Sequence, residues 1–294
     1  MKNSDKTKVK ERLFAGLQYL FPQHTISRLA GLIGDHPSPV IRDTLIKWWI
    51  KKYNVAMDEA LHEDIASYKS FNDFFTRSLK PEARPLPEDQ RVIVSPADGT
   101  VSQLGNITSG RIVQAKGFDF SIEELCGADD TLTKTFSSGL FGTIYLSPGD
   151  YHRVHMPCTG ELQKMIYIPG RLFSVNDVCN QRIPRLFARN ERIVCLFDTD
   201  YGPMAIVMVG ALIVGSIETV WQGEVTPVRR KQKVYDYVDE PKASVIIKRG
   251  DEMGRFKLGS TVIVLFARDN ICPEETLNPS SKIQLGQPFA YPDH

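Results

Sequence analysis

The sequence changes character between residues 80 and 90, and this change constrains the fold more than any other feature of the chain. Before it, apolar side chains recur at helical spacing. After it, short β-branched runs are broken by Gly, Pro, Asp and Asn. The segment 80–90 is rich in proline and polar residues, which predicts a linker or extended arm. We therefore expect an α+β protein, with amphipathic helices in residues 1–80 and a β-rich sandwich or barrel-like domain in residues 81–294.

Three helices are predicted in the first part. The apolar side chains from Val9 to Phe21 share one helical face, and Pro22 should end that helix. A second helix is expected over 26–33 and a third over 39–53, where Trp48 and Trp49 alternate with basic side chains. Basic amphipathic helices with aromatic residues can lie in a membrane interface, although such helices also pack on protein cores.

The β-rich part contains short runs that read as strands. They cover 92–94, 99–104, 111–115, 140–146, 161–168, 192–197, 204–214 and 216–220. No helical pattern alternates regularly with them, which disfavours a doubly wound parallel sheet.

Charge is divided unevenly along the chain. Residues 1–52 hold ten Lys and Arg against four Asp and Glu, a net +6, so the remainder carries −5 within the total of +1. A basic end on an acidic body is typical of a segment that meets an anionic surface. The overall balance gives no indication of nucleic-acid binding.

Cysteine usage and hydropathy bear on the compartment. The five cysteines are widely spaced and form no C-x-x-C pair, which indicates buried thiols in a reducing compartment (Cys126, Cys158, Cys179, Cys195 and Cys272). No run of about 18 apolar residues is present. Arg12, Gln18 and Gln23 interrupt any signal-peptide core. We expect a chain that is soluble or lies on a membrane without crossing it.

Three local features of the β-rich part offer chemistry. Asp98 lies in Ser95–Gly99, a turn-like sequence that follows an apolar run, although an isolated Asp-Gly is most often only a turn. His152 and His155 lie between Pro148 and Pro157, in a segment too short for a good helix. Zinc would need further ligands, and none lies nearby in sequence besides Asp98, so we predict no metal site.

Ser260 follows Gly259 in the third feature, residues 253–262. The flanking glycines of the G-x-S-x-G elbow are absent, which disfavours an ordinary α/β-hydrolase. A Gly-Ser pair at a strand-edge bulge is the structural alternative. Together with a histidine and Asp98, Ser260 meets the composition of a nucleophile–base–orienter triad. The residues alone lead no further than an acyl-transfer hypothesis.

Seven segments, taken in order, resemble the bacterial phosphatidylserine decarboxylases. They are Phe71–Arg77, Pro96–Gly99, Asp150–Pro157, Leu172–Asn176, Leu186–Glu191, Val214–Trp221 and Gly254–Thr261. They spread over most of the chain, so chance similarity is excluded by their shared order. The chain lacks, after Pro288, the longer acidic tail of some relatives, a departure outside every matching segment.

The resemblance implies a self-cleaving proenzyme. His155, oriented by Asp98, would be the base for Ser260, whose hydroxyl attacks the Gly259 carbonyl. The resulting ester would eliminate to dehydroalanine, and hydrolysis would leave a covalent pyruvoyl cofactor. Cleavage between Gly259 and Ser260 would give a large β chain (1–259) and a small α chain (260–294), which remain associated. Gly259 suits the strained turn that this attack requires.

The resemblance also implies the reaction. The pyruvoyl group would form a Schiff base with the serine amine of phosphatidylserine and act as an electron sink during decarboxylation to phosphatidylethanolamine. His152 would return a proton to the α-carbon. The expected partners are phosphatidylserine, an anionic membrane surface and a second copy in a homodimer. The expected location is the cytoplasmic face of the cell membrane, where residues 1–80 attach peripherally.

Two other functions stay open on the sequence. A serine protease or esterase would use the triad of Asp98, His155 and Ser260 on external substrates, and Ser260 would then survive as serine. A non-enzymatic membrane-binding module would use only the N-terminal helices and leave the triad without a role.

Overall fold

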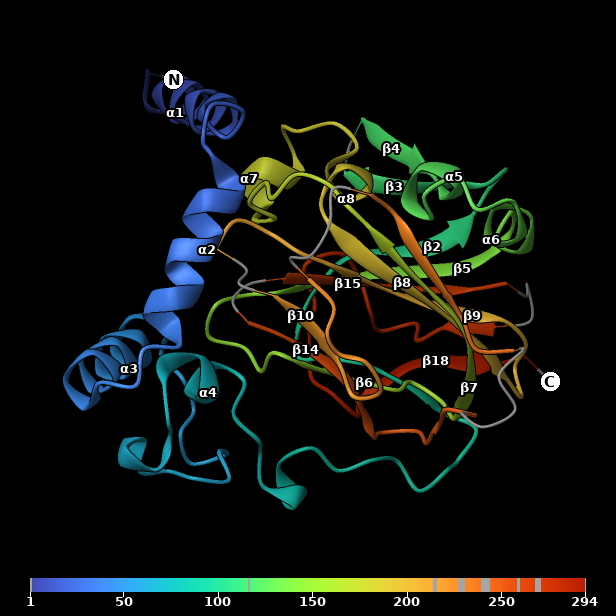
Figure 1. Ribbon diagram of the computed structural model, residues 1–294. Coiled ribbons are helices and arrows are strands. Elements are labelled where there is room, and N and C mark those ends of the chain that lie inside the picture. The colour runs from blue at the N-terminus through green and yellow to red at the C-terminus, as the bar shows by residue number, and fades with distance from the viewer. Residues whose placement is uncertain are drawn as a thin grey trace.

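The computed structural model describes residues 2–115, 117–213, 216–226, 231–238, 244–257, 260–267 and 271–293, with side chains from residue 10 onward. The longer helices come before the first strand, and short helices lie among the strands that follow, as Figure 1 shows. The helices are α1 (Lys2–Leu17), α2 (Gln23–Gly34), α3 (Pro39–Tyr53), α4 (Phe71–Phe75), α5 (Ile122–Leu125), α6 (Asp130–Thr135), α7 (Asp177–Asn180) and α8 (Leu186–Arg189), with 3₁₀ turns η1 (Ile65–Ser67) and η2 (Pro81–Ala83).

Each of the eight predicted runs overlaps a strand, and ten further strands of the described residues were not predicted. The strands are β1 (Ile93–Val94), β2 (Gly99–Ile107), β3 (Arg111–Ala115), β4 (Phe118–Ser121), β5 (Gly139–Leu146), β6 (Arg153–His155), β7 (Gly160–Ile168), β8 (Arg192–Thr199), β9 (Met204–Val209), β10 (Ile217–Thr219), β11 (Gly223–Glu224), β12 (Lys233–Asp236), β13 (Ile246–Ile247), β14 (Glu252–Phe256), β15 (Ser260–Phe266), β16 (Ile271–Pro273), β17 (Lys282–Ile283) and β18 (Pro288–Pro292).

One large antiparallel sheet organises the β-rich region. Its order is β12-β7-β8-β9-β15-β5-β2-β17, with β13 also paired to β7. Smaller sheets have the orders β11-β10-β14-β6 and β1-β18-β16, and β3 pairs with β4. The α+β prediction is confirmed. Among the described strands the large sheet is open, with β12 and β17 as its edges, so a layered sandwich describes it and a closed barrel does not.

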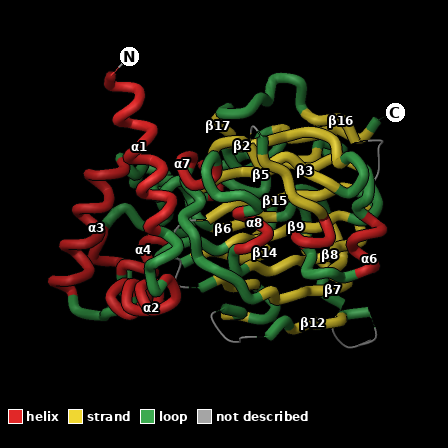
Figure 2. Tube along the Cα trace, turned by 90° about the horizontal axis from the view of Figure 1, so that it is seen from above, coloured by secondary structure: helices red, strands yellow, loops and turns green. Residues whose placement is uncertain are grey.

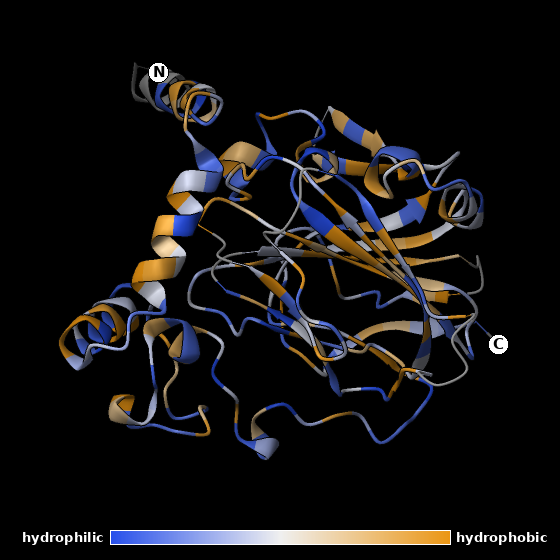
Figure 3. Cartoon of the chain, in the orientation of Figure 1, coloured by the Kyte–Doolittle hydropathy of each residue, from blue (hydrophilic) through white to orange (hydrophobic). Residues whose placement is uncertain are grey.

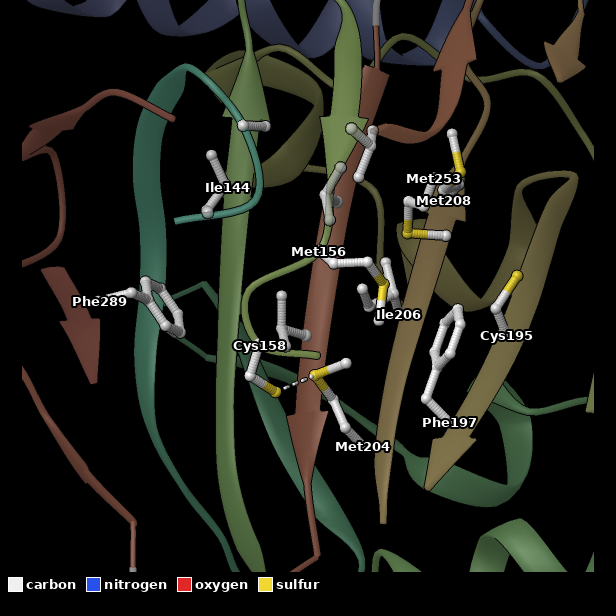
Figure 4. Close-up of a cluster of buried hydrophobic side chains, with 14 of the residues drawn as sticks. Ile144, Met156, Cys158, Cys195, Phe197, Met204, Ile206, Met208, Met253 and Phe289 are labelled. Carbon is white, nitrogen blue, oxygen red and sulfur yellow. Dashed lines mark hydrogen bonds between the residues drawn. The ribbon is translucent and has the colours of Figure 1, made fainter. Parts of the chain in front are cut away.

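Central strands of the large sheet are buried on both faces. Along β9, Met204, Ile206 and Met208 belong to one hydrophobic cluster, whereas the alternate residues Ala205, Val207 and Val209 belong to the other. The period of two in side-chain direction explains this division. The small sheets cover the first face, and helices α5 to α8 with β3 and β4 cover the second. Figure 4 shows the first cluster, in which the Cys158 thiol approaches the Met204 sulfur at 3.8 Å.

Helices α1 to α4 lie together at one end of the sheets (Figure 2). The prediction of a helix over 39–53 matches α3 at both ends. The first helix ends at Leu17, before the predicted end at Phe21, and a turn precedes Pro22. Within the described residues no helix is long and apolar enough to cross a bilayer.

The predicted strand 204–214 was too long. β9 stops at Val209; the amide of Gly210 still donates to Glu191 O at 2.9 Å, and the chain then leaves the sheet. Ile213 adopts a positive φ of 75°, far from the extended backbone that a β-branched residue has in a strand. Val214 lies outside the described residues.

Candidate active site

Strand register brings Asp98 and Ser260 to the same end of the large sheet. Thr100 of β2 and Thr261 of β15 both pair with Tyr145 of the intervening strand β5. Ser260 pairs with the next residue, Leu146. Two interstrand spacings place the start of β2 roughly 10 Å from Ser260. A side chain at Gly99 would collide with Tyr145 O, so glycine is needed where the chain turns into β2 after Asp98.

Asp98 is buried and held by a cation. Arg84 donates from Nε to Oδ1 at 2.9 Å and from Nη2 to Oδ2 at 2.6 Å. The backbone amide of Leu285 also donates to Oδ1, at 2.8 Å. Arg84 extends the network to Glu59, at 2.8 Å. The Asp98 carboxylate is thus held in place at both oxygens, because charge-assisted hydrogen bonds are short and directional.

His155 is oriented by backbone rather than by Asp98. Its Nδ1 lies 2.7 Å from the carbonyl oxygen of Gly250, and its Nε2 lies 3.2 Å from the hydroxyl of Tyr151. A carbonyl only accepts, so Nδ1 carries the proton and Nε2 offers its lone pair. Burial lowers the pKa of His155, which keeps the ring neutral at pH 7. Its amide donates to Pro96 O at 2.8 Å, which ties it to the segment of Asp98.

His152 is completely buried. Its Nδ1 donates to Asp150 O at 2.8 Å, and its ring centroid lies 4.1 Å from that of Phe75 on α4. Burial, with a smaller contribution from the Arg77 charge, lowers the pKa of His152 to about 3. Nε2 has no hydrogen-bond partner. The ring is therefore neutral at pH 7 and has one unused basic nitrogen.

Ser260 is the first residue of β15 and is fully buried, and its Oγ has no hydrogen-bond partner. Gly259, the other residue of the predicted cleavage site, lies outside the described residues. Within the described residues no hydrogen bond joins Asp98, His155 and Ser260. The three predicted residues are brought to one end of the sheet, but each side chain has other partners or none.

A cavity of roughly 220 Å³ opens beside Ser260. Its lining comes from α3, from the turn after β5, and from the loops that follow Leu172 and Gly210; it includes Trp49, Tyr53, Tyr145, Pro148, Val175, Ala211, Leu212 and Ile213. Trp49 closes one side and donates from Nε1 to Pro148 O at 2.8 Å. Mostly apolar and aromatic walls around one buried hydroxyl suit an amphipathic ligand.

Comparison with known proteins gives the family of this chain. The family model described as phosphatidylserine decarboxylase matches residues 71–291, and a second model, described as PSD, matches residues 13–54. The chain belongs to the phosphatidylserine decarboxylase family. A phosphatidylserine decarboxylase proenzyme of Pseudomonas putida (strain GB-1) is 53% identical over 284 residues, 97% of this chain and 99% of the relative. The proenzyme of Vibrio vulnificus (strain YJ016) is 53% identical over 283 residues, 96% of this chain and 99% of the relative.

Two arginines of this family member escaped the sequence analysis. Arg84 lies in the segment predicted as a linker, where nothing local indicates that it binds Asp98. Arg77 ends the segment Phe71–Arg77, which was noticed only as part of the resemblance. Its guanidinium is buried and makes no hydrogen bond or ion pair with a described residue. Other buried arginines, Arg192 and Arg249, each donate to three carbonyl oxygens.

No group of three or more His, Cys, Asp and Glu side chains in the described residues is arranged to hold a metal ion. A pyruvoyl group made from Ser260 fits the site better. It would stand at the first residue of a strand, next to the cavity, where the Oγ has no partner to lose.

Proposed function

We propose that this chain decarboxylates phosphatidylserine to phosphatidylethanolamine and CO₂, after it has cut itself between Gly259 and Ser260. The observation that carries this proposal is the buried, unpartnered Ser260 hydroxyl beside a cavity whose other wall is helix α3. Family membership supports the reaction. The cut, the cofactor and the residue roles are inferred from the site.

Self-cleavage exchanges an amide for an ester. The Ser260 hydroxyl adds to the carbonyl carbon of residue 259 while a base accepts its proton. The C–N bond then breaks, and the base passes that proton to the Ser260 nitrogen, which becomes a free amine. Nε2 of His155 is suited to this, because Gly250 O fixes the proton on Nδ1. Ser260 would replace the Tyr151 hydroxyl at Nε2. The anionic Asp98 nearby would stabilise the imidazolium that forms, as a triad carboxylate does.

Loss of the Ser260 α-proton then breaks the ester C–O bond and leaves a carboxylate on residue 259. Water replaces the nitrogen, ammonia leaves, and the new N-terminus is a pyruvoyl group. That group supplies the electron sink for decarboxylation. His152 is the acid that we assign to return a proton to the α-carbon, from Nε2. Its low pKa means that the ring takes up that proton only when an anion enters beside it.

The two chains should stay together after the cut. β15 begins at Ser260 and pairs with β9 on one side and β5 on the other, both of which belong to the large chain. β17 pairs with β2, and β18 pairs with β1. A central strand cannot leave without exposing both hydrophobic clusters.

Residues 1–80 are assigned to an anionic lipid surface. The outward faces of α1 to α3 and the turn after α1 carry large apolar side chains, including Leu32 at 70% and Val40 at 75% exposure on the helices and Leu20 at 78% in the turn. Figure 3 shows hydrophobic stretches along α2. Exposed apolar residues with a net charge of +6 over residues 1–52 fit an interface with anionic lipid. We assign the enzyme to the cytoplasmic face of the membrane.

Two experiments test the proposal. Intact-mass analysis should find two fragments split at Gly259–Ser260, the smaller with a blocked N-terminus; a single chain that hydrolyses esters would favour the protease or esterase alternative. Leu13, Leu17 and Leu20 replaced together by Ser should release the protein from anionic vesicles. Loss of folding in that variant would assign the apolar face to the core. A change of oligomeric state in place of vesicle release would assign it to the homodimer expected from the family.

A further inference from the structure

Helices α1 and α2 and the turn between them contact the β-rich region partly through polar side chains, beside Ala15 of α1, which is buried in the second hydrophobic cluster. Gln18 in the turn after α1 and Gln23 and Ser27 on α2 are each at most 3% exposed. Each of the three accepts a hydrogen bond from a backbone amide: Gln18 Oε1 from Ser174 at 3.2 Å, Gln23 Oε1 from Leu172 at 2.9 Å, and Ser27 Oγ from Ile213 at 3.1 Å. We call these three residues the helix seat.

Apart from the hydrogen bond that Gln23 Nε2 donates to Gln18 O, the helix seat bonds, among the described residues, to the segments 172–174 and 213. These belong to the loops 170–176 and 211–213, here called the cavity loops. The same loops form one wall of the cavity at Ser260, through Ser174, Val175 and Asn176 and through Ala211, Leu212 and Ile213. A side chain on a lipid-facing helix is thus one hydrogen bond away from the wall of the substrate cavity.

The contact at Ser27 supports a strained residue. Ile213 has a φ of 75°, a left-handed conformation that is a genuine outlier for a β-branched side chain. Such conformations persist only where the surroundings hold them, and they gather at ligand clamps and switch regions. β9 has already ended at Val209, so no sheet neighbour fixes this loop, and Ser27 Oγ accepts the Ile213 amide.

We propose that Gln18, Gln23 and Ser27 are positioning residues for the substrate cavity. They hold the cavity loops in the shape that receives the apolar part of the lipid next to its head group, and they do so best when α1 and α2 rest on the membrane. This rests on the proposed function, since it concerns the same cavity. The proposal predicts that the enzyme prefers serine linked to a lipid over small serine derivatives, because the cavity wall formed by the cavity loops is mostly apolar.

Ser27→Ala tests this in the full-length, self-cleaved enzyme. Loss of one hydrogen bond should raise KM for soluble dihexanoyl-phosphatidylserine about two- to tenfold. kcat and self-cleavage should stay within twofold, because the loops contribute no reacting group. Ser27→Thr keeps the hydroxyl and should restore KM. Thr44→Ala is the matched control, since that hydroxyl bonds only to Val40 O within α3.

Hydrogen exchange gives a readout that does not depend on activity. Amides of 211–213 should exchange faster in Ser27→Ala than in the native protein. Phosphatidylglycerol vesicles should slow that exchange in the native protein but not in the variant. If the native enzyme binds vesicles but does not decarboxylate phosphatidylserine, the proposed function fails while this measurement still decides the coupling.

A double variant separates positioning from general stability. Glycine adopts φ of 75° without strain, so Ser27→Ala should raise KM less in an Ile213→Gly background than in the native one. Equal effects in the two backgrounds would overturn the proposal. So would an unchanged KM with unchanged loop exchange, or faster exchange throughout the molecule with a lowered melting temperature.

Discussion

Strands β8 and β9 bury apolar side chains on both faces, whereas α2 and the turn before it bury polar side chains against the protein and present leucines to solvent. Phe197 on β8 is fully buried, and Leu32 on α2 is 70% exposed. Gln23 on the same helix is 3% exposed. Burial of apolar surface stabilises the first region. In the second region, hydrogen bonds to backbone amides fix the position of the helices, which leaves their apolar surface available for a different apolar phase.

This difference implies that the β-rich region carries the chemistry and that the N-terminal helices carry membrane attachment. Variants of the catalytic residues test whether the two functions are independent. Ser260→Ala should leave one uncut chain with no decarboxylase activity, a loss of at least about 10⁴-fold, because no hydroxyl remains to accept the acyl group. His155→Ala and Asp98→Asn should also impair the cut. Denaturing gels measure the cut, and CO₂ release measures decarboxylase activity. Vesicle binding should persist in all three variants, and its loss would show that the two regions are not independent.

His152→Ala should be cut into two chains but decarboxylate about 10²–10⁴-fold more slowly, because only the protonation step is assigned to it. Single-turnover CO₂ release by the processed variant is the measurement. Normal turnover would remove His152 from the mechanism. An uncut variant with a native melting temperature would mean that the roles of the two histidines overlap.

Phe197→Ala and Leu32→Ala compare the two kinds of apolar residue directly. The first should cost about 3–5 kcal/mol of unfolding free energy, because it opens a cavity in the core. The second should change that free energy by less than about 0.5 kcal/mol and weaken vesicle binding instead. Denaturant titration and vesicle co-sedimentation separate the effects. A large stability loss for Leu32→Ala would place this residue in the core.

Charge reversal tests the electrostatic half of attachment. Replacing Lys8, Lys10 and Arg12 by Glu should weaken binding to anionic vesicles by about 3 kcal/mol or more, at ~1 kcal/mol for each near-surface charge. Added salt should likewise weaken vesicle binding by the native protein, since exposed charges are screened within a Debye length of about 8 Å. Lys134→Glu, on α6, is the control and should bind normally. Self-cleavage should be unchanged throughout.

The buried histidines make stability depend on pH. The folded pKa of His152 is about 3, below its ordinary unfolded value of about 6.5, so its contribution is complete above pH 6.5 and is lost as pH falls. Between pH 7 and pH 5 the loss should be about 2 kcal/mol. Burial also lowers the pKa of His155, so this group changes the stability in the same direction. His152→Gln should flatten the profile. An equally steep profile in that variant would assign the effect to other groups.

The sequence by itself determined the elements and their order. Pro22, and the apolar periodicity over 39–53, placed the helices to within a few residues, because those signals are local. Eight of the eighteen described strands were visible as β-branched runs between turn residues, and β15, which begins at Ser260, was not among them. The seven motif segments also named Asp98, His152, His155 and Ser260 as candidates before any contact was known.

Only the tertiary structure decided which groups meet. Pairing of β2 and β15 with β5 brings Asp98 near Ser260, although 162 positions separate them, and register of this kind depends on long-range packing. That packing also places Arg84 within hydrogen-bond distance of Asp98, and Gly250 O within hydrogen-bond distance of His155. The same holds for Gln18, Gln23 and Ser27, which are hydrophilic by composition but buried. A periodic pattern shows which side chains share a face, and only the packed chain shows what that face touches.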